Sequence, residues 1–289
     1  MELLKHYIST SRPITWVIHI NMVLIGAIVA GEGSINDFVA LVPLLILFSL
    51  PYSAVIFGVN DYYDYESDVA NLRKGGFFGE KHNLDHKKRL LLYTWISSLV
   101  GAILLIPYFS LELLVIYLLM TANFYFYSSP PFRFKSFPII DFVSGGFFYA
   151  VPICVMGFIA GGGELAAFTD SLVSGISVVL IVSTVSHIMA ALLDRDADKL
   201  QGLKTTPIKV GYRNSIYICL SMIALGGYVV RNNWFLLTYL VFLFVTVASF
   251  LITDGKKSLP LQITISKYFT VISSVLGVLV ALIRPELFI

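Results

Sequence analysis

Charged residues are scarce in this sequence. Only 13% of its 289 residues are Asp, Glu, Lys or Arg, whereas 57% are hydrophobic. A soluble domain carries roughly a quarter charged residues, so this chain lacks the polar surface that a water-soluble fold needs. Cysteine is scarce too: Cys154 and Cys219 both fall inside apolar stretches and give no sign of a disulfide framework. The composition excludes a soluble globular domain and indicates a membrane protein.

Short alternating strands, low-complexity linkers and a signal-peptide cleavage site are also missing. A transmembrane barrel would show alternating segments of about ten residues, but here the apolar residues form long runs. Nine runs approach or exceed the roughly 17–20 residues that a helix needs to cross a hydrocarbon core of about 30 Å. They cover 14–31, 38–59, 91–108, 111–128, 140–160, 171–193, 214–231, 233–252 and 263–283. We expect an all-α polytopic protein with about nine transmembrane helices around a central cavity, forming one domain over 1–289 and retaining its first span.

Lysine and arginine are distributed unevenly between the two sides of the expected bundle. If the N-terminus is cytoplasmic and nine spans alternate, all of the 20 basic residues except Arg231, Lys267 and Arg284 fall in cytoplasmic segments. The positive-inside rule predicts this asymmetry. Basic loops that face anionic lipid or an anionic substrate account for the positive charge, so no nucleic-acid partner is implied. We expect an integral protein of the cell membrane, among membrane lipids, with its functional loops on the cytoplasmic side.

Acidic residues concentrate in two motifs, NDYYDYESD at 60–68 and DRDADKLQG at 194–202. Each motif follows an apolar run, at the cytoplasmic end of the second or sixth expected span. If the helices continue, Asn60, Asp64 and Asp68 share one face at i, i+4 and i+8, and Asp61 joins that side. The pair Asp194 and Asp198 repeats the i, i+4 spacing.

A solvated or capping role explains these motifs poorly. Carboxylates stabilise helix N-termini, whereas these follow helix C-terminal ends, where the macrodipole is already negative, and like charges at i, i+4 repel. A bound cation would relieve both effects. Oxygen ligands of this kind suit Mg²⁺, which takes one or two carboxylates and completes its shell with water and phosphate oxygens. Two facing clusters with basic residues nearby predict two Mg²⁺ ions bridged by the diphosphate of a substrate whose lipid tail lies in the bilayer.

Four segments resemble motifs of the UbiA-type intramembrane prenyltransferases. NDYYDYESD has the N-D-x-x-D-x-x-x-D form of that family's first motif, and DRDADKLQGLKTTPIKVG resembles the second motif with its K-x-T segment. YSSPPFRFKSFPIID is similar to the family's Y-S-x-P-P-x-R-x-K segment with its following aspartate, and SRPITW to the N-terminal Arg-Pro. The order of these segments and the number of expected spans match that family as well.

The resemblance implies a reaction and a set of site residues. Mg²⁺ assists the loss of pyrophosphate from a prenyl diphosphate, and an electron-rich lipophilic acceptor captures the allylic cation and loses a proton. The implied metal ligands are Asn60, Asp61, Asp64, Asp68, Asp194 and Asp198, and the implied catalytic carboxylates are Asp64, Asp68, Asp194 and Asp198. The implied diphosphate-binding residues are Asn60, Arg73, Lys74, Tyr127, Arg133, Lys135 and Lys204.

One departure from the family pattern narrows the acceptor. Quinone-type and archaeal ether-lipid relatives usually follow the first motif with N/T-x-x-R-P-x-x-x-G, whereas this chain reads VANLRKGGFFGEKHNL. That continuation is similar to the lycopene elongases, which implies dimethylallyl diphosphate as donor and a carotenoid such as lycopene as acceptor. An aromatic quinone precursor or an ether lipid is the alternative within the family, and a cation-binding transporter is the alternative outside it. The sequence leaves the donor's chain length and the oligomeric state open.

Polar residues inside the expected spans are further candidates. His187 lies two turns before Asp194 on the same face, so it could touch the acceptor or receive a proton, or it could be a hydrogen-bonded histidine between helices. Asn123, one turn before Tyr127, fits either the cavity wall or an interhelical hydrogen bond. His19 has no polar partner near it in the sequence, which favours a structural role.

Overall fold

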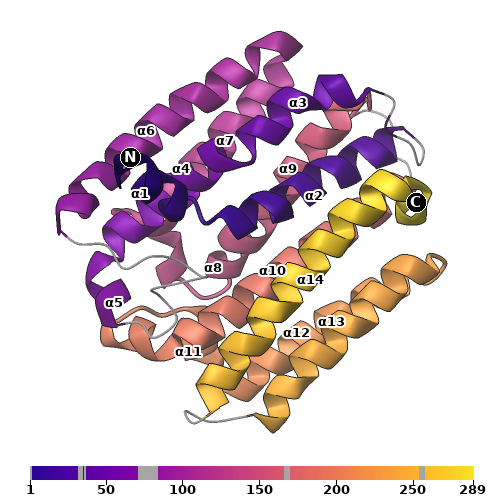
Figure 1. Ribbon diagram of the computed structural model, residues 1–289. Coiled ribbons are helices and arrows are strands. Elements are labelled where there is room, and N and C mark those ends of the chain that lie inside the picture. The colour runs from indigo at the N-terminus through magenta and orange to yellow at the C-terminus, as the bar shows by residue number, and fades with distance from the viewer. Residues whose placement is uncertain (1, 32–34, 36, 71–83, 166–169, 254–257) are drawn as a thin grey trace.

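The protein is a bundle of helices, seen in a computed structural model (Figure 1). The structure describes all residues except 1, 32–34, 36, 71–83, 166–169 and 254–257. Within the described residues there are helices and turns but no strand, which confirms the all-α expectation. The helices are α1 (Glu2–Thr10), α2 (Pro13–Ala30), α3 (Phe38–Leu47), α4 (Leu50–Tyr63), α5 (Tyr65–Ala70), α6 (Leu84–Leu104), α7 (Leu111–Ser128), α8 (Ile140–Phe142), α9 (Phe148–Ala160), α10 (Asp170–Leu200), α11 (Thr206–Val210), α12 (Tyr212–Val229), α13 (Trp234–Ile252) and α14 (Leu259–Ile283).

Most of the long helices are apolar enough to cross a bilayer. Within the described residues, eight helical stretches meet this requirement, and they correspond to eight of the nine expected spans. The remaining expected span, 214–231, is occupied mainly by α12, which is 18 residues long but begins with the polar residues Tyr212, Arg213 and Asn214. The chain is therefore an integral, multi-pass membrane protein.

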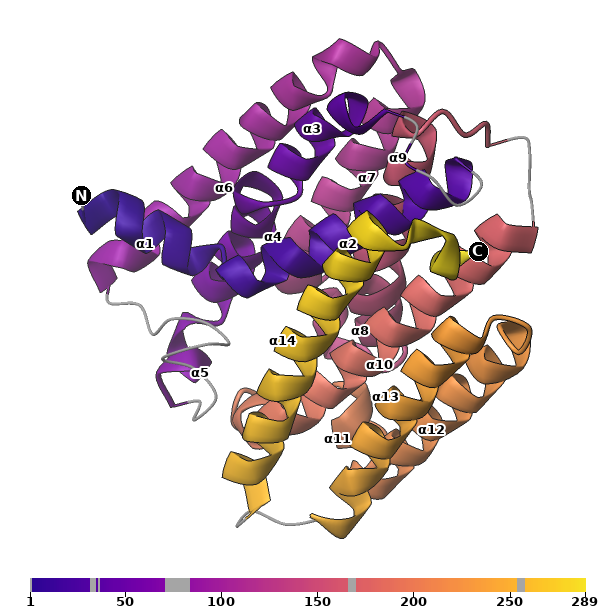
Figure 2. The same ribbon diagram turned by 45° about the vertical axis from the view of Figure 1, so that its right-hand side comes forward.

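Helix α2 lies between the two halves of the bundle (Figures 1 and 2). One hydrophobic core forms around α3, α4, α7 and α9, another around α10, α12, α13 and α14, and α2 contributes to both. Two glycines let α2 approach α9 closely. A Cβ at Gly157 would lie 2.2 Å from the Val23 carbonyl oxygen, and one at Gly26 would lie 1.9 Å from the Cys154 carbonyl oxygen. Small residues permit this backbone contact, which stabilises helix pairs in membranes.

The second membrane stretch is divided into two helices. α3 ends at Leu47 and α4 begins at Leu50, with Pro51 in its first turn. Proline suits the first turn of a helix, whereas in a helix interior it removes one backbone hydrogen bond and its ring crowds the preceding turn. The break at Phe48 and Ser49 follows from this. It leaves the Phe48 carbonyl oxygen 2.9 Å from His19 Nδ1.

A π-helical turn over Val143–Phe147 precedes α9 and packs against α10. Two glycines make the contact possible. A Cβ at Gly145 would lie 2.2 Å from His187 Cε1, and one at Gly146 would lie 2.8 Å from Thr184 Cα. Turns of this type within helices occur frequently at functional sites. This one brings the start of α9 against the polar face of α10.

Candidate active site

A large cavity lies among α2, α4, α7, α9, α10, α13 and α14. Its volume is about 710 Å³. On α10, residues from Gly175 to Asp198 line it, and a helix of that length spans about 35 Å, comparable with the hydrocarbon core of a bilayer, about 30 Å. Charged residues line one end, which we call the mouth, and most of the remaining wall is apolar. The cavity can accommodate a long apolar chain whose polar end is held at the mouth.

Both acidic motifs contribute to the mouth. Asn60, Asp64 and Asp68 line it from the α4 and α5 side, and Asp194 and Asp198 line it from α10. The first helix is interrupted at Asp64, but backbone hydrogen bonds from Asp64 N to Asn60 O and from Asp68 N to Asp64 O, both 2.9 Å, keep the helical phase. These five side chains therefore share one cavity, as their spacing predicts.

Asp61 lies away from the position that its spacing predicts. It is fully buried and outside the cavity wall, and its Oδ1 is 2.6 Å from Arg12 Nη2. The Arg12 guanidinium also lies over the Phe57 ring, 4.0 Å from the ring centroid. One step along a helix turns a residue by about 100°, so Asp61 faces the start of α2 while Asn60 faces the mouth. In this structure Asp61 is an anchor between α2 and α4, off the cavity wall, beside Arg12, which itself lines the cavity.

Two basic residues reach the mouth from the segment after α7. Lys135 is buried, lines the cavity and forms an ion pair with Asp64. Arg133 Nη2 lies 3.7 Å from Asp64 Oδ1 and 3.5 Å from Gln201 Oε1, so it bridges the two acidic motifs. Cations at these positions favour the binding of an anionic group beside the carboxylates.

The remaining charged candidates are placed differently. Lys204 is exposed and lies outside the cavity wall. Arg73 and Lys74 lie outside the described residues. Asp196, between the two carboxylates of the second motif, is also exposed, because its helical phase turns it away from the cavity.

A buried aspartate ties the basic segment to the end of α10. Asp141 accepts hydrogen bonds from Thr206 N at 2.6 Å and Thr206 Oγ1 at 2.5 Å, and Thr206 Oγ1 accepts one from Ile139 N at 2.8 Å. Arg133 and Ile139 have positive φ angles of 44° and 74°. Such conformations cost about 1–3 kcal/mol each and persist where surrounding contacts hold them. This clasp positions the segment that carries Lys135 against the residues that follow the second motif.

Tyr127 and His187 meet beside the mouth. Both line the cavity, and Tyr127 Oη is 3.2 Å from His187 Nε2. The Tyr127 hydroxyl lies within the electrostatic reach of Asp64, Asp141, Asp194 and Asp198. Asn123 lies outside the wall, because it exchanges hydrogen bonds with Ser144: Ser144 Oγ donates to Asn123 Oδ1 at 2.8 Å, and Asn123 Nδ2 donates to Ser144 O at 3.2 Å. Asn123 therefore has the interhelical role.

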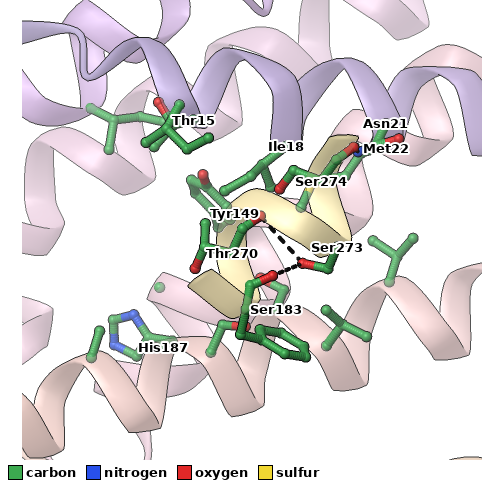
Figure 3. Close-up of a pocket in the computed structure, with 18 of the residues that line it drawn as sticks. Thr15, Ile18, Asn21, Met22, Tyr149, Ser183, His187, Thr270, Ser273 and Ser274 are labelled. Atoms are coloured by element: carbon green, nitrogen blue, oxygen red, sulfur yellow. Dashed lines mark hydrogen bonds between the residues drawn. The ribbon is translucent and has the colours of Figure 1, made fainter. Parts of the chain in front are cut away.

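Deeper in the cavity, several polar side chains donate their hydrogen bonds to backbone carbonyl groups of the protein (Figure 3). Ser183 Oγ donates to Gly146 O at 3.0 Å, and Ser273 Oγ donates to Phe269 O at 2.6 Å. Asn21 Nδ2 donates to Ser274 O at 2.7 Å. Side chains whose donors are already bonded to carbonyl groups contribute little polarity to the wall, so this part of the cavity suits an apolar guest.

Tyr149 also lines the cavity and was not found by sequence analysis. Its Oη is 2.6 Å from Nε2 of His19, which is completely buried behind it. His19 and Tyr149 are 130 positions apart, and only the packing of α2 on α9 brings them together. No local spacing in the sequence could have indicated this pair.

The residues at the mouth are suited to a hard divalent cation. Carboxylate and amide oxygens are the ligands that Mg²⁺ prefers, and it usually takes only one or two carboxylates together with water and phosphate oxygens. Among the described residues, no group of three or more His, Cys, Asp or Glu side chains is arranged to hold a metal ion by itself. The carboxylate and amide oxygens at the mouth, together with water and phosphate oxygens, fit an ion that is shared between the protein and a phosphate-bearing ligand.

The fold and the site together define a helical, multi-pass membrane protein with two aspartate motifs at the mouth of an intramembrane cavity. The sequence profile of the UbiA prenyltransferase family matches residues 20–258. The chain belongs to this family, and it is an enzyme of the prenyltransferase class.

Individual relatives resemble it over most of their length. A lycopene elongase/hydratase from Corynebacterium glutamicum is 28% identical over 236 residues, which cover 80% of this chain and 78% of that protein. A digeranylgeranylglyceryl phosphate synthase from Methanobrevibacter smithii is 26% identical over 250 residues, covering 85% and 84% of the two chains. A UbiA homolog from Archaeoglobus fulgidus, solved bound to DMAPP and Mg²⁺, has a TM-score of 0.67 at 18% identity, covering 95% and 99%.

Proposed function

We propose that this protein transfers a five-carbon prenyl group from dimethylallyl diphosphate to a carotenoid such as lycopene, in a Mg²⁺-dependent reaction within the membrane. The observation that carries the proposal is the convergence of both acidic motifs at one end of a long, mainly apolar cavity. The relatives named lycopene elongase/hydratase support a carotenoid acceptor. The related structure with DMAPP and Mg²⁺ supports this donor and this metal.

The mouth would bind the diphosphate and its metal ions. Asn60, Asp64 and Asp68 would hold one side of a pair of Mg²⁺ ions, and Asp194 and Asp198 the other. The ions supply Lewis acidity that helps the pyrophosphate leave. Phosphate oxygens would be neutralised by basic residues, for which we propose Arg73, Lys74, Arg133, Lys135 and Lys204, and Tyr127 would donate a hydrogen bond.

The apolar wall would protect the reaction from water. An allylic cation reacts with any nucleophile within reach, so a cavity that excludes water directs it to the acceptor. A carotenoid is long, linear and apolar, and a cavity as long as the membrane core suits such a molecule better than a single aromatic ring. The C–C bond then forms from the π electron pair of the acceptor's terminal double bond.

We infer the orientation of the protein in the membrane from the charged residues at the mouth. The basic residues near the mouth favour the cytoplasmic side, and water-soluble dimethylallyl diphosphate would enter from there. We infer one catalytic domain over 1–289, with the lipid bilayer around it.

An ether-lipid precursor is the second candidate acceptor. The similarity to a digeranylgeranylglyceryl phosphate synthase favours it, because that protein is matched over a similar share of the chain. An aromatic quinone precursor is the third. A cation transporter is disfavoured, because transporter sites lie near the bilayer midplane, whereas these carboxylates line the end of the cavity.

The test is a transfer assay in membranes that contain the protein. Labelled dimethylallyl diphosphate and Mg²⁺ would be supplied with lycopene, with 4-hydroxybenzoate, or with a glyceryl phosphate ether, and geranyl diphosphate would be compared as donor. Label entering the carotenoid and lost on adding EDTA is the expected result. Label entering only another acceptor would overturn the carotenoid assignment. Failure to release pyrophosphate from any prenyl diphosphate would overturn the reaction itself.

A further inference from the structure

Three groups form a hydrogen-bonded chain behind the cavity wall. Tyr149 Oη on α9 is 2.6 Å from His19 Nε2 on α2, and His19 Nδ1 is 2.9 Å from the Phe48 carbonyl oxygen. The break between α3 and α4 places that carbonyl there. Tyr149 lines the cavity, whereas His19 and Phe48 are completely buried behind it.

The partners determine where the protons of this chain lie. A carbonyl oxygen only accepts hydrogen bonds, so the close Phe48 oxygen requires the proton of a neutral His19 to be on Nδ1. Ser53 Oγ, 3.2 Å from the same nitrogen, can accept from it as well. His19 Nε2 then carries a lone pair, and it must accept the proton of the Tyr149 hydroxyl. Tyr149 is left with its oxygen lone pairs for the cavity.

Tyr149 and His19 lie at the depth in the cavity that is expected for the reacting carbons. His19 is seven positions along α2 from Arg12, which pairs with Asp61 in the first motif, and His187 is seven positions before Asp194 in the second. Seven residues of helix correspond to about 10 Å. Tyr149 lines the cavity, and Figure 3 shows its side chain near Ile18 and Thr270, apart from His187. A five-carbon group whose diphosphate is held at the mouth would extend to this depth.

Most polar side chains at this depth are unsuited to accept a proton. Ser183, Ser273 and Asn21 are neutral and do not titrate, and their donors are committed to carbonyl groups. His187 and Tyr239 also line the cavity and can titrate, but His187 Nε2 faces the Tyr127 hydroxyl, and Tyr239 has the Ser273 hydroxyl beside it rather than a base. Tyr149 combines a hydroxyl at the cavity wall with a hydrogen-bonded base behind it.

We propose that Tyr149 and His19 form the proton acceptor that completes the prenyl transfer, an inference that rests on the proposed function. Tyr149 Oη takes a proton from the carbon next to the cationic centre of the coupled acceptor, while its own proton passes to His19 Nε2. Tyr149 is the catalytic residue because it faces the substrate, and His19 acts through it.

The step balances in atoms and electrons. The C–O bond to pyrophosphate breaks and its electron pair leaves with the pyrophosphate. The acceptor's π pair forms the new C–C bond and leaves a tertiary cation. The C–H bond next to it then breaks, and its pair forms a new double bond. The proton goes to Tyr149 Oη, and the positive charge ends on His19, whose Nδ1 proton stays bonded to the Phe48 carbonyl. The proton returns to Tyr149 and then to pyrophosphate or water as product leaves.

Two substitutions test whether Tyr149 and His19 act in proton transfer or only maintain the structure. Tyr149→Phe keeps the ring and removes the oxygen. His19→Gln keeps a donor for Phe48 and an acceptor for Tyr149 but has no basic nitrogen. Tyr52→Phe is the matched control, because the buried Tyr52 hydroxyl has no hydrogen-bond partner among the described residues and its ring lies 5.7 Å from the His19 ring. Retention of fold is checked for each by thermal unfolding in detergent.

The assay measures pyrophosphate release and product identity in the same reaction. We expect Tyr149→Phe and His19→Gln to release pyrophosphate at close to the wild-type rate but to form the alkene product about 10²-fold more slowly, the usual contribution of a general base. Water then captures the cation more often, so the ratio of alcohol to alkene rises above the wild-type ratio. Tyr52→Phe should behave as wild type.

Other outcomes would overturn the inference. An unchanged ratio of product to pyrophosphate in Tyr149→Phe would show that its oxygen takes no part in proton removal. Equal losses of pyrophosphate release and product in both variants would show a structural role only. If His187→Gln shifts the product to alcohol while Tyr149→Phe does not, His187 is the base. In each of these cases wild-type transfer continues, which distinguishes them from failure of the proposed function.

Discussion

The two acidic motifs lie on helices that are built differently. The first motif crosses an interruption at Asp64, where α4 ends and the short α5 begins. The second lies within α10, which is continuous over its 31 residues. Both motifs nevertheless present two carboxylates to the same cavity.

Because of this difference, the aspartates of the first motif have different partners. Asp64 contacts Lys135 and Arg133 at the mouth, whereas its neighbour Asp61 is withdrawn into an ion pair with Arg12. In the second motif the off-phase residue, Asp196, is exposed instead. The off-phase carboxylate of the first motif is thus buried against Arg12, at the start of α2, whereas that of the second motif lies on the exposed side of α10.

The largest expected effect is on the carboxylates at the mouth. Asp64→Asn and Asp198→Asn should each lower the rate of pyrophosphate release by roughly 10²–10³-fold, because each removes charge that stabilises the leaving group through its metal. The measurement is release from dimethylallyl diphosphate over a range of Mg²⁺ concentrations. Asp196→Asn is the matched control and should leave the rate unchanged. Equal effects at Asp196 and Asp198 would contradict the helical phase of α10.

Replacing Asp61 should lower the free energy of unfolding rather than change the reaction itself. Asp61→Leu leaves the Arg12 charge buried without its carboxylate, and breaking a buried pair costs about 3–5 kcal/mol. Unfolding in detergent measures the loss. The double variant Asp61→Leu/Arg12→Met should recover most of it, because an apolar pair can replace a buried ion pair. If the double variant is no more stable than Asp61→Leu, the Arg12 contact is not the reason for the burial of Asp61.

The smallest of these effects concerns the basic residues. Lys135→Met should raise the KM for the donor roughly 10- to 100-fold, since a charge-assisted hydrogen bond contributes roughly 1.5–3 kcal/mol. Lys204→Met should change it less, because Lys204 is exposed. Steady-state kinetics at saturating Mg²⁺ provide the measurement. A larger effect at Lys204 than at Lys135 would place the diphosphate nearer to the loop after α10.

Much of the fold could be predicted from the sequence. The apolar runs predicted the all-α class and eight spans that the structure contains, and the i, i+4 spacing predicted that Asn60, Asp64 and Asp68 share a face. The spacing did not predict the position of Asp61, because a helix face about 100° wide includes neighbours that packing then separates. It also could not indicate the Asp141 clasp, whose partner Thr206 lies 65 residues away.

The sequence by itself determined the class of this protein and the residue types that line the mouth. Long apolar runs must become helices, because backbone groups in lipid have to bond within their own segment, and carboxylates repeated at helical spacing must lie on one side of their helix. Only the tertiary structure decided which carboxylate faces the cavity, which is withdrawn to Arg12, and that His19 stands behind Tyr149. These contacts join helices that are distant in the chain, and they depend on close packing at glycines such as Gly26 and Gly157, for which local spacing carries no signal.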